Sequence, residues 1–168
     1  MFQLKSTLRL FLLCLVLAAT SGFGEEPPKI SALGAIDREF MAQQRQRIDQ
    51  LARFNLGKQI NSEKANDLGI LQTLLDRHLI KPEQTLESQA MGVIMGDLLA
   101  QELGMQWVTY EDRYGRSRAL QLDRGENFLF PITMISRRAE VGARVNVEQV
   151  YEKAAAAIQP YRRALPFR

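Results

Sequence analysis

The sequence MGVIMGDLLAQELGMQWVTYED, residues 91–112, changes its hydrophobic period once, and this change decides the fold class. Up to Leu103, apolar residues recur at three- and four-residue steps, which is typical of an α-helix. After Gly104, aromatic and β-branched residues alternate with polar ones, which predicts a strand. A helix followed at once by a strand indicates a domain in which helices pack on one face of an antiparallel sheet.

The helix predicted from about residue 82 to 103 carries small residues at four-residue intervals. This small-residue stripe consists of Ser88, Gly92, Gly96 and Ala100. Glycine costs a helix about 1 kcal/mol relative to alanine, so two glycines on one line indicate that another backbone lies close to them. We expect the stripe to pack against a sheet or a neighbouring helix. The alternative is an interaction face for a second copy or a partner protein.

The flanking patterns complete the prediction of an α+β fold with three N-terminal helices, a three- to four-stranded antiparallel meander and one C-terminal helix. The first helix starts near Asp37, stops at Gly57 and has a thin apolar stripe of Ile36, Phe40, Ile48 and Leu51. The second starts at Asn61 or Ser62, and Pro82 ends it. The remaining predicted elements are strands at 105–111, 117–122 and 127–130, an extended continuation at 132–139, and a last helix at 147–158.

The N-terminus has the pattern of a secretory signal peptide over residues 1–24. Lys5 and Arg9 precede an apolar run at 10–19, and small residues follow at 20–24. The run is shorter than the roughly 20 residues that span a bilayer, so cleavage is favoured over an uncleaved anchor. We therefore expect an exported protein, periplasmic if the host has two membranes, with no integral membrane segment after cleavage.

After the signal peptide we expect a flexible lead-in at 25–34, a single domain at 35–160 and a basic tail at 161–168. Paired prolines and Gly34 discourage a helix in the lead-in. The tail carries three arginines and no acid, which suits either a frayed terminus or contact with anionic lipid.

Charge and cysteine content narrow the classes of function. The chain has 22 basic and 19 acidic residues, and removal of residues 1–24 leaves a single excess positive charge. Nucleic-acid binding needs a concentrated basic surface, so no nucleic-acid partner is expected. Cys14, the only cysteine, lies in the signal peptide. The mature chain therefore has no disulfide, thiol nucleophile or thiolate metal site.

No catalytic constellation stands out, and we assign no catalytic residue, metal or cofactor. His78 is the only histidine, and no spacing surrounds it with the three or four ligands that zinc needs. A carboxylate pair remains open as an alternative, because acidic residues gather at the hairpin ends: Glu111, Asp112, Asp123 and Glu126. Turn formation explains the aspartates as well.

A few side chains are candidates for ligand or anion contacts: Trp107, Tyr114, Arg137 and Arg138. Trp107 lines a ligand groove in one interpretation and belongs to the core in the other. The paired arginines bind an anion in one interpretation. In the other they face solvent at a sheet edge, where charge discourages aggregation.

Motifs between Asp67 and Tyr151 resemble a family of small bacterial exported proteins classed as a domain of unknown function. They are the Asp-Leu-Gly-Ile-Leu-Gln segment at 67–72, a Gly-x-x-x-Gly-Asp helix at 92–97, a Trp-Val strand at 107–108, an Asp-x-Tyr-Gly turn at 112–115 and a Phe-Pro strand starting at 130. The resemblance covers about half of the chain. It implies no established activity, so no catalytic role is carried over.

These patterns favour an exported, non-enzymatic binding domain whose partner is a protein or another component of the cell envelope. The alternative is a carboxylate-dependent hydrolase that acts on an envelope polymer. The sequence leaves the oligomeric state open.

Overall fold

The computed structural model describes residues 26–162, so the expected signal peptide and most of the expected tail lie outside the described residues. Within this part of the chain, the elements in order are β1 (Lys29–Ala32), α1 (Ala35–Leu56), α2 (Lys64–Asp76), α3 (Thr85–Leu103), β2 (Met105–Asp112), β3 (Gly115–Leu122), β4 (Phe128–Leu129), α4 (Ile132–Glu140), α5 (Val147–Ile158) and the short 3₁₀ helix η1 (Gln159–Tyr161). The strands form one antiparallel sheet in the order β1-β2-β3-β4. The α+β class predicted from the sequence is confirmed.

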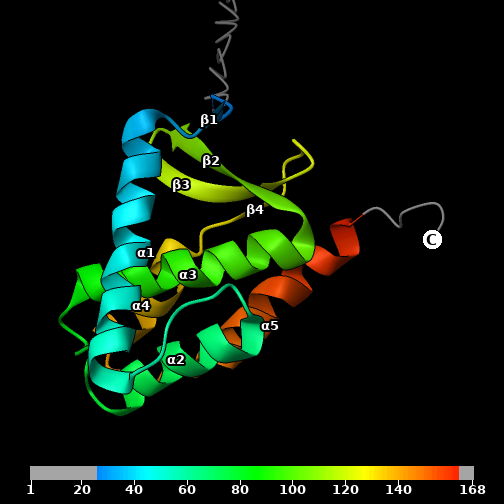
Figure 1. Cartoon of the computed structure of the whole chain (residues 1–168). Coiled ribbons are helices and arrows are strands. Elements are labelled where there is room, and N and C mark those ends of the chain that lie inside the picture. The colour runs from blue at the N-terminus through cyan, green and yellow to red at the C-terminus, as the bar shows by residue number, and fades with distance from the viewer. Residues whose placement is uncertain (1–25, 163–168) are drawn as a thin grey trace, which may run out of the picture.

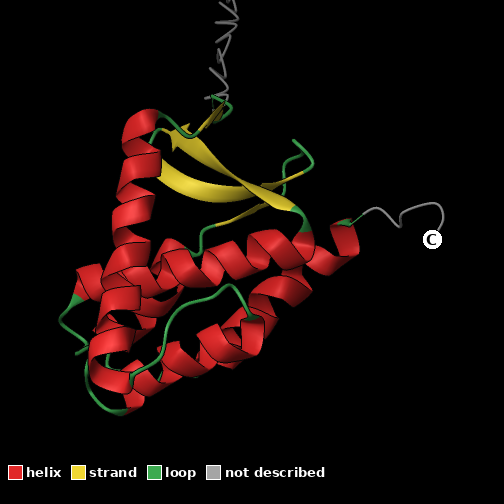
Figure 2. Cartoon of the chain, viewed as in Figure 1, coloured by secondary structure: helices red, strands yellow, loops and turns green. Residues whose placement is uncertain are grey.

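Helix α3 occupies the middle of the molecule (Figure 1). It contacts β2 and β3 on one side and α2 and α5 on the other, while α1 and α4 pack along it. Figure 2 shows the sheet at one end of the molecule and most of the helices at the other, with the long α1 beside both. Because α3 is surrounded, apolar residues are buried all round it, including Met91, Val93, Met95 and Leu99.

The residues expected to form a flexible lead-in contain a strand, so that expectation was wrong for 29–32. Strand β1 pairs with β2 in the register Ile30↔Tyr110 and Ala32↔Val108. The paired prolines precede the strand and leave its hydrogen bonding intact. The partner strand lies far along the sequence, so a local reading of residues 25–34 could not reveal that their backbone groups are paired.

The extended segment predicted at 132–139 is helix α4, and that prediction was also wrong. Pro131 has helical backbone angles, with φ of −63°, and its carbonyl accepts a hydrogen bond from the Met134 amide at 3.0 Å. The buried residues are Ile135, Ser136 and Ala139. This is a helical spacing, which the short alternating pattern concealed. Proline favours the start of a helix, because the first helical amides have no partner to lose.

Some predicted boundaries and faces also shift. Helix α2 begins at Lys64, because the Asp67 carboxylate accepts hydrogen bonds from the amides of Asn61 and Ser62, the two residues expected to cap it. On α1 the buried face is Asp37, Met41, Gln44, Ile48 and Ala52. Of the predicted stripe, Ile48 belongs to this face, whereas Ile36 is 81% exposed.

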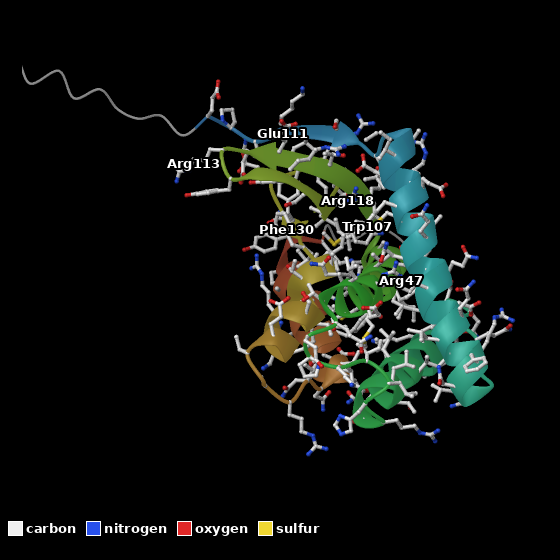
Figure 3. All side chains as sticks on the ribbon, turned by 90° about the vertical axis from the view of Figure 1, so that its left-hand side faces the viewer. Arg47, Trp107, Glu111, Arg113, Arg118 and Phe130 are labelled. Atoms are coloured by element: carbon white, nitrogen blue, oxygen red, sulfur yellow. The ribbon has the colours of Figure 1, made fainter. Side chains whose placement is uncertain are left out.

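A buried carboxylate joins α1 to the sheet. Asp37 Oδ2 lies 2.5 Å from Arg116 Nη2 and accepts the Gly34 amide at 3.2 Å, while Oδ1 lies 2.9 Å from Arg118 Nη2. The Arg118 guanidinium also stacks on the Phe40 ring at 4.0 Å, and Figure 3 shows it pointing from the sheet toward α1. Burial raises the pKa of Asp37, but these hydrogen bonds and charges outweigh it and hold the pKa below its usual value.

The two glycines of the small-residue stripe admit close neighbours. A Cβ atom on Gly92 would lie 2.6 Å from the carbonyl oxygens of Pro131 and Ile132, and one on Gly96 would overlap the Trp107 ring. The backbone that approaches α3 is therefore the start of α4, in the same chain. Within residues 26–162, no helix has the length and apolar character to cross a bilayer.

We predict that Gly92→Ala lowers the free energy of unfolding by about 1–3 kcal/mol, because the new methyl group meets fixed backbone atoms. Gly69→Ala is the matched control, since it makes the same change inside α2 where nothing lies within 4 Å. It should raise stability by about 0.5–1 kcal/mol. Denaturant melts measure both values, and a Gly92→Ala protein as stable as the control would contradict the close contact.

We predict that Asp37→Asn lowers stability at neutral pH by about 2–3 kcal/mol, because hydrogen bonds to a charged group are lost. Since the folded-state pKa is depressed, the contribution is fully present above the unfolded pKa of about 4 and disappears as pH falls through the folded value. The difference between wild type and variant should therefore shrink below about pH 4.

Glu39→Gln, on the exposed side of α1, should change stability by less than about 0.5 kcal/mol at any pH. A constant difference down to acid pH would contradict this account.

Candidate functional site

Trp107 anchors the sheet to the helices. Its indole Nε1 donates a hydrogen bond to Asp97 Oδ1 at 2.9 Å, and its ring lies against Gly96. Arg45, from α1, holds the same carboxylate with two hydrogen bonds of 2.6 and 2.8 Å. The hydrogen bond to Asp97 raises the pKa of Arg45 above its ordinary value. Figure 3 shows Trp107 between the sheet and α3. The ring and its polar atom are therefore engaged within the fold, which leaves little of Trp107 for a ligand.

The other sequence-based candidates are dispersed. Ser88, Gly92 and Gly96 are buried, and the start of α4 and Trp107 cover the two glycines, so the small-residue stripe presents no free face there. Tyr114 is 80% exposed in the β2–β3 turn, where the Arg113 guanidinium stacks on its ring at 4.6 Å.

The paired arginines stand on a helix and not at a sheet edge. Arg137 and Arg138 are exposed in the last turn of α4, and Arg138 Nη1 donates to the Met134 carbonyl of the same helix. Tyr114 and the two arginines thus lie on separate elements of the fold.

The four carboxylates proposed for a hydrolase are not brought together. Glu111 and Asp112 lie at one end of the β2–β3 hairpin, and Asp123 and Glu126 follow β3 at its other end. A strand of eight residues separates these ends by roughly 25 Å, whereas paired catalytic carboxylates lie about 5–9.5 Å apart. Asp112 accepts the Tyr114 amide at 2.8 Å, and Asp123 has φ of 48°, so both serve turns. No group of His, Cys, Asp and Glu suited to a metal is found within residues 26–162.

The described surface has a groove between α2 and the segment 144–148 that leads into α5. Its volume is about 780 Å³. This lies in the range of small-molecule sites, which are mostly apolar with a few polar groups. Its lining residues are Glu63, Lys64, Ala65, Leu68, Gly69, Gln72, Asp76, Arg144, Val145, Asn146 and Glu148.

A second cavity of about 380 Å³ continues the groove toward the end of α2. The two cavities share Asp76, Arg144 and Val145, so they form one elongated depression with these residues at the junction. The second cavity adds His78, which is exposed and takes a left-handed conformation with φ of 53° just beyond α2.

Gln72 joins the two walls of the groove. Its Nε2 donates to the Val145 carbonyl at 3.2 Å, and its Oε1 accepts the Val147 amide at 2.8 Å. The Gln72 side chain thus makes the two hydrogen bonds to the backbone before α5 that a neighbouring strand would make. It holds the groove at a fixed width, which reduces the ordering that a ligand must impose when it binds.

Lys64 has its charge engaged at one end of the groove. Its ammonium lies 2.9 Å from Glu152 and 3.1 Å from Glu102, and 4.4 Å from the ring centre of Tyr151. The hydrogen bond to Glu152 contributes most to a raised pKa of Lys64. Burial, and then the hydrogen bond that the hydroxyl donates to Glu102, raises the pKa of Tyr151. These groups tie α2, α3 and α5 together and leave little charge for a ligand.

A family model for a domain of unknown function, DUF3806, matches residues 67–151 of this sequence. The protein belongs to the DUF3806 family. The DUF3806 segment begins in the first turn of α2 and ends within α5, so it contains most of both walls of the groove. It also contains Gly96, Asp97 and Trp107, whose contacts anchor the sheet.

A crystal structure from Bacteroides thetaiotaomicron, at 1.50 Å resolution, resembles this DUF3806 protein with a TM-score of 0.69 and 20% identity. The match covers 77% of this chain and 48% of that one, so the present chain spans about half the length of its structural relative. At this identity the likeness shows the fold alone. None of the curated proteins matches the sequence.

Sequence reasoning missed the groove. Gly69 carried the available signal, because a glycine within a leucine-rich helix has no side chain to fill the space beside it. A Cβ atom there would meet nothing within 4 Å.

Proposed function

We propose that this DUF3806 protein is an exported, non-enzymatic binding domain that holds a small ligand or a segment of an envelope component in the groove between α2 and residues 144–148. The observation that carries the proposal is the groove itself. Its volume of about 780 Å³, the apolar surface of Ala65, Leu68 and Val145, and the Gln72 bridge that fixes its width are features of ligand sites.

The hydrolase alternative draws no support from this geometry. The carboxylates on which it depended lie at opposite ends of a strand, and none of the four lines the groove. The groove acids, Glu63, Asp76 and Glu148, are accompanied by Arg144 and Lys64, so the lining is mixed in charge. A binding role needs no more than this arrangement of apolar surface and charge.

We predict that Gly69→Leu weakens ligand binding about tenfold without loss of the fold. Leucine would project into open space in the groove, and its helix propensity exceeds that of glycine by close to 1 kcal/mol, so the variant should melt at or above wild type. Ala42→Leu, on an exposed face of α1, is the control for an added apolar side chain.

Mass spectrometry of small molecules and peptides retained from envelope extract provides the measurement. Wild type and Ala42→Leu should retain the same compounds, and Gly69→Leu should lose them about tenfold, as expected for a difference of about 1.4 kcal/mol. Equal retention by all three proteins would show that the groove is not the site.

The proposed site of action is the periplasm, or the outside of a cell with one membrane, and it rests on the pattern of residues 1–24. We predict that the protein recovered from the soluble envelope fraction starts near Glu25. N-terminal sequencing measures this directly. Recovery of chains that still begin at Met1, in the membrane pellet, would instead indicate an uncleaved anchor.

A further inference from the structure

The junction of the two groove cavities holds an acid and a base that are not paired with each other. Asp76 and Arg144 line both cavities, and both side chains are exposed. Among the described residues, neither has an ion-pair partner, and the only hydrogen bond to Asp76 comes from the neutral Gln72 at 3.0 Å. Two opposite charges that flank one depression and remain available are complementary to a ligand that carries both charges itself.

The surroundings of this pair select the rest of the ligand. Leu68 and Val145 are core residues, 6% and 7% exposed, that line the depression next to the charges, and Gly69 leaves the adjacent space open. A simple fatty anion would satisfy Arg144 but would place its chain beside the Asp76 carboxylate. A polyamine would satisfy Asp76 and leave Arg144 facing positive charge. A peptide carries an ammonium group, a carboxylate and aliphatic side chains in one short molecule.

We propose that the groove binds a short peptide in its zwitterionic form, with the terminal ammonium beside Asp76, the terminal carboxylate beside Arg144 and an aliphatic side chain against Leu68 and Gly69. This inference rests on the proposed function, because it names the ligand class of the same groove. It assigns a specific role to each charge, and each role can be removed separately.

The test uses leucine, alanyl-leucine and alanyl-leucyl-alanine, each with free ends, with an acetylated amino group or with an amidated carboxylate. Affinities for the wild-type mature protein are measured by calorimetry and by shifts of the Val145 and Val147 amide resonances. At least one free compound should bind. Acetylation and amidation should each weaken its binding about tenfold, as expected for the loss of one charge-assisted contact.

Two conservative variants assign the ends of the peptide. Asp76→Asn keeps a hydrogen-bond acceptor for Gln72. In this variant the acetylated compound should bind as well as the free one, whereas amidation should still weaken binding. Arg144→Gln should do the reverse. Asp123→Asn, at the far end of β3, and Arg137→Gln, on α4, are the matched controls and should keep both penalties.

Other outcomes overturn the inference and separate it from the proposed function. If blocked and free compounds bind equally, or if none binds while Gly69→Leu still loses compounds from envelope extract, the groove binds ligands but not zwitterionic peptides. If Gly69→Leu retains the same compounds from the extract as wild type, and none of the test compounds binds to the wild-type protein, both the peptide inference and the groove proposal fail.

Discussion

The contact of the Trp107 ring with Gly96 is the constraint on which the rest of the structure depends. A side chain at position 96 would occupy the place of the ring, and without the ring the sheet would lose its main anchor on α3. The indole hydrogen bond to Asp97 fixes the direction of the ring, and Arg45 then links the same carboxylate to α1. One small residue, one large residue and one acid thus set the relative positions of the sheet and two helices. Gly96, Asp97 and Trp107 therefore serve packing in this chain, and the candidate site is formed by other residues.

The sequence predicted elements whose signals are local. The last helix was predicted at Val147–Ile158, where the structure has it, because its apolar residues keep a helical spacing. The structure adds a cap, since the Asn146 side chain accepts a hydrogen bond from the Gln149 amide. Gly57 and Gly104 end helices with φ of 62° and 71°. Strand β1 and helix α4 were missed for different reasons. The first depends on a partner strand far along the chain, and the second on packing against Gly92 that overrides a short alternating pattern.

The groove could not be predicted, because a hollow is defined by what two distant segments leave empty. Gly69 and Gln72 lie on α2, whereas Arg144 and Val145 follow α4, and no periodicity relates the two segments. Charged and aromatic residues were identified from the sequence as candidates, but only by their chemical type and not by their contacts in the fold. The structure uses several of these in turns, ion pairs and the core. Polar groups that satisfy one another stabilise the fold, whereas groups that remain unsatisfied in a depression are those available to a ligand.

The pairing of β1 with β2 has a consequence for the order of folding. Lys29 and its partner Glu111 are 82 positions apart, whereas β2 and β3 are joined by a tight turn. The hairpin closes a small loop and can form as soon as it is synthesised, but the β1 pairing must wait for the helices between the two strands. Synthesis runs from the N-terminus, so β1 is made long before its partner β2. Until β1 pairs, β2 carries an unpaired edge that a chaperone or a second chain can occupy.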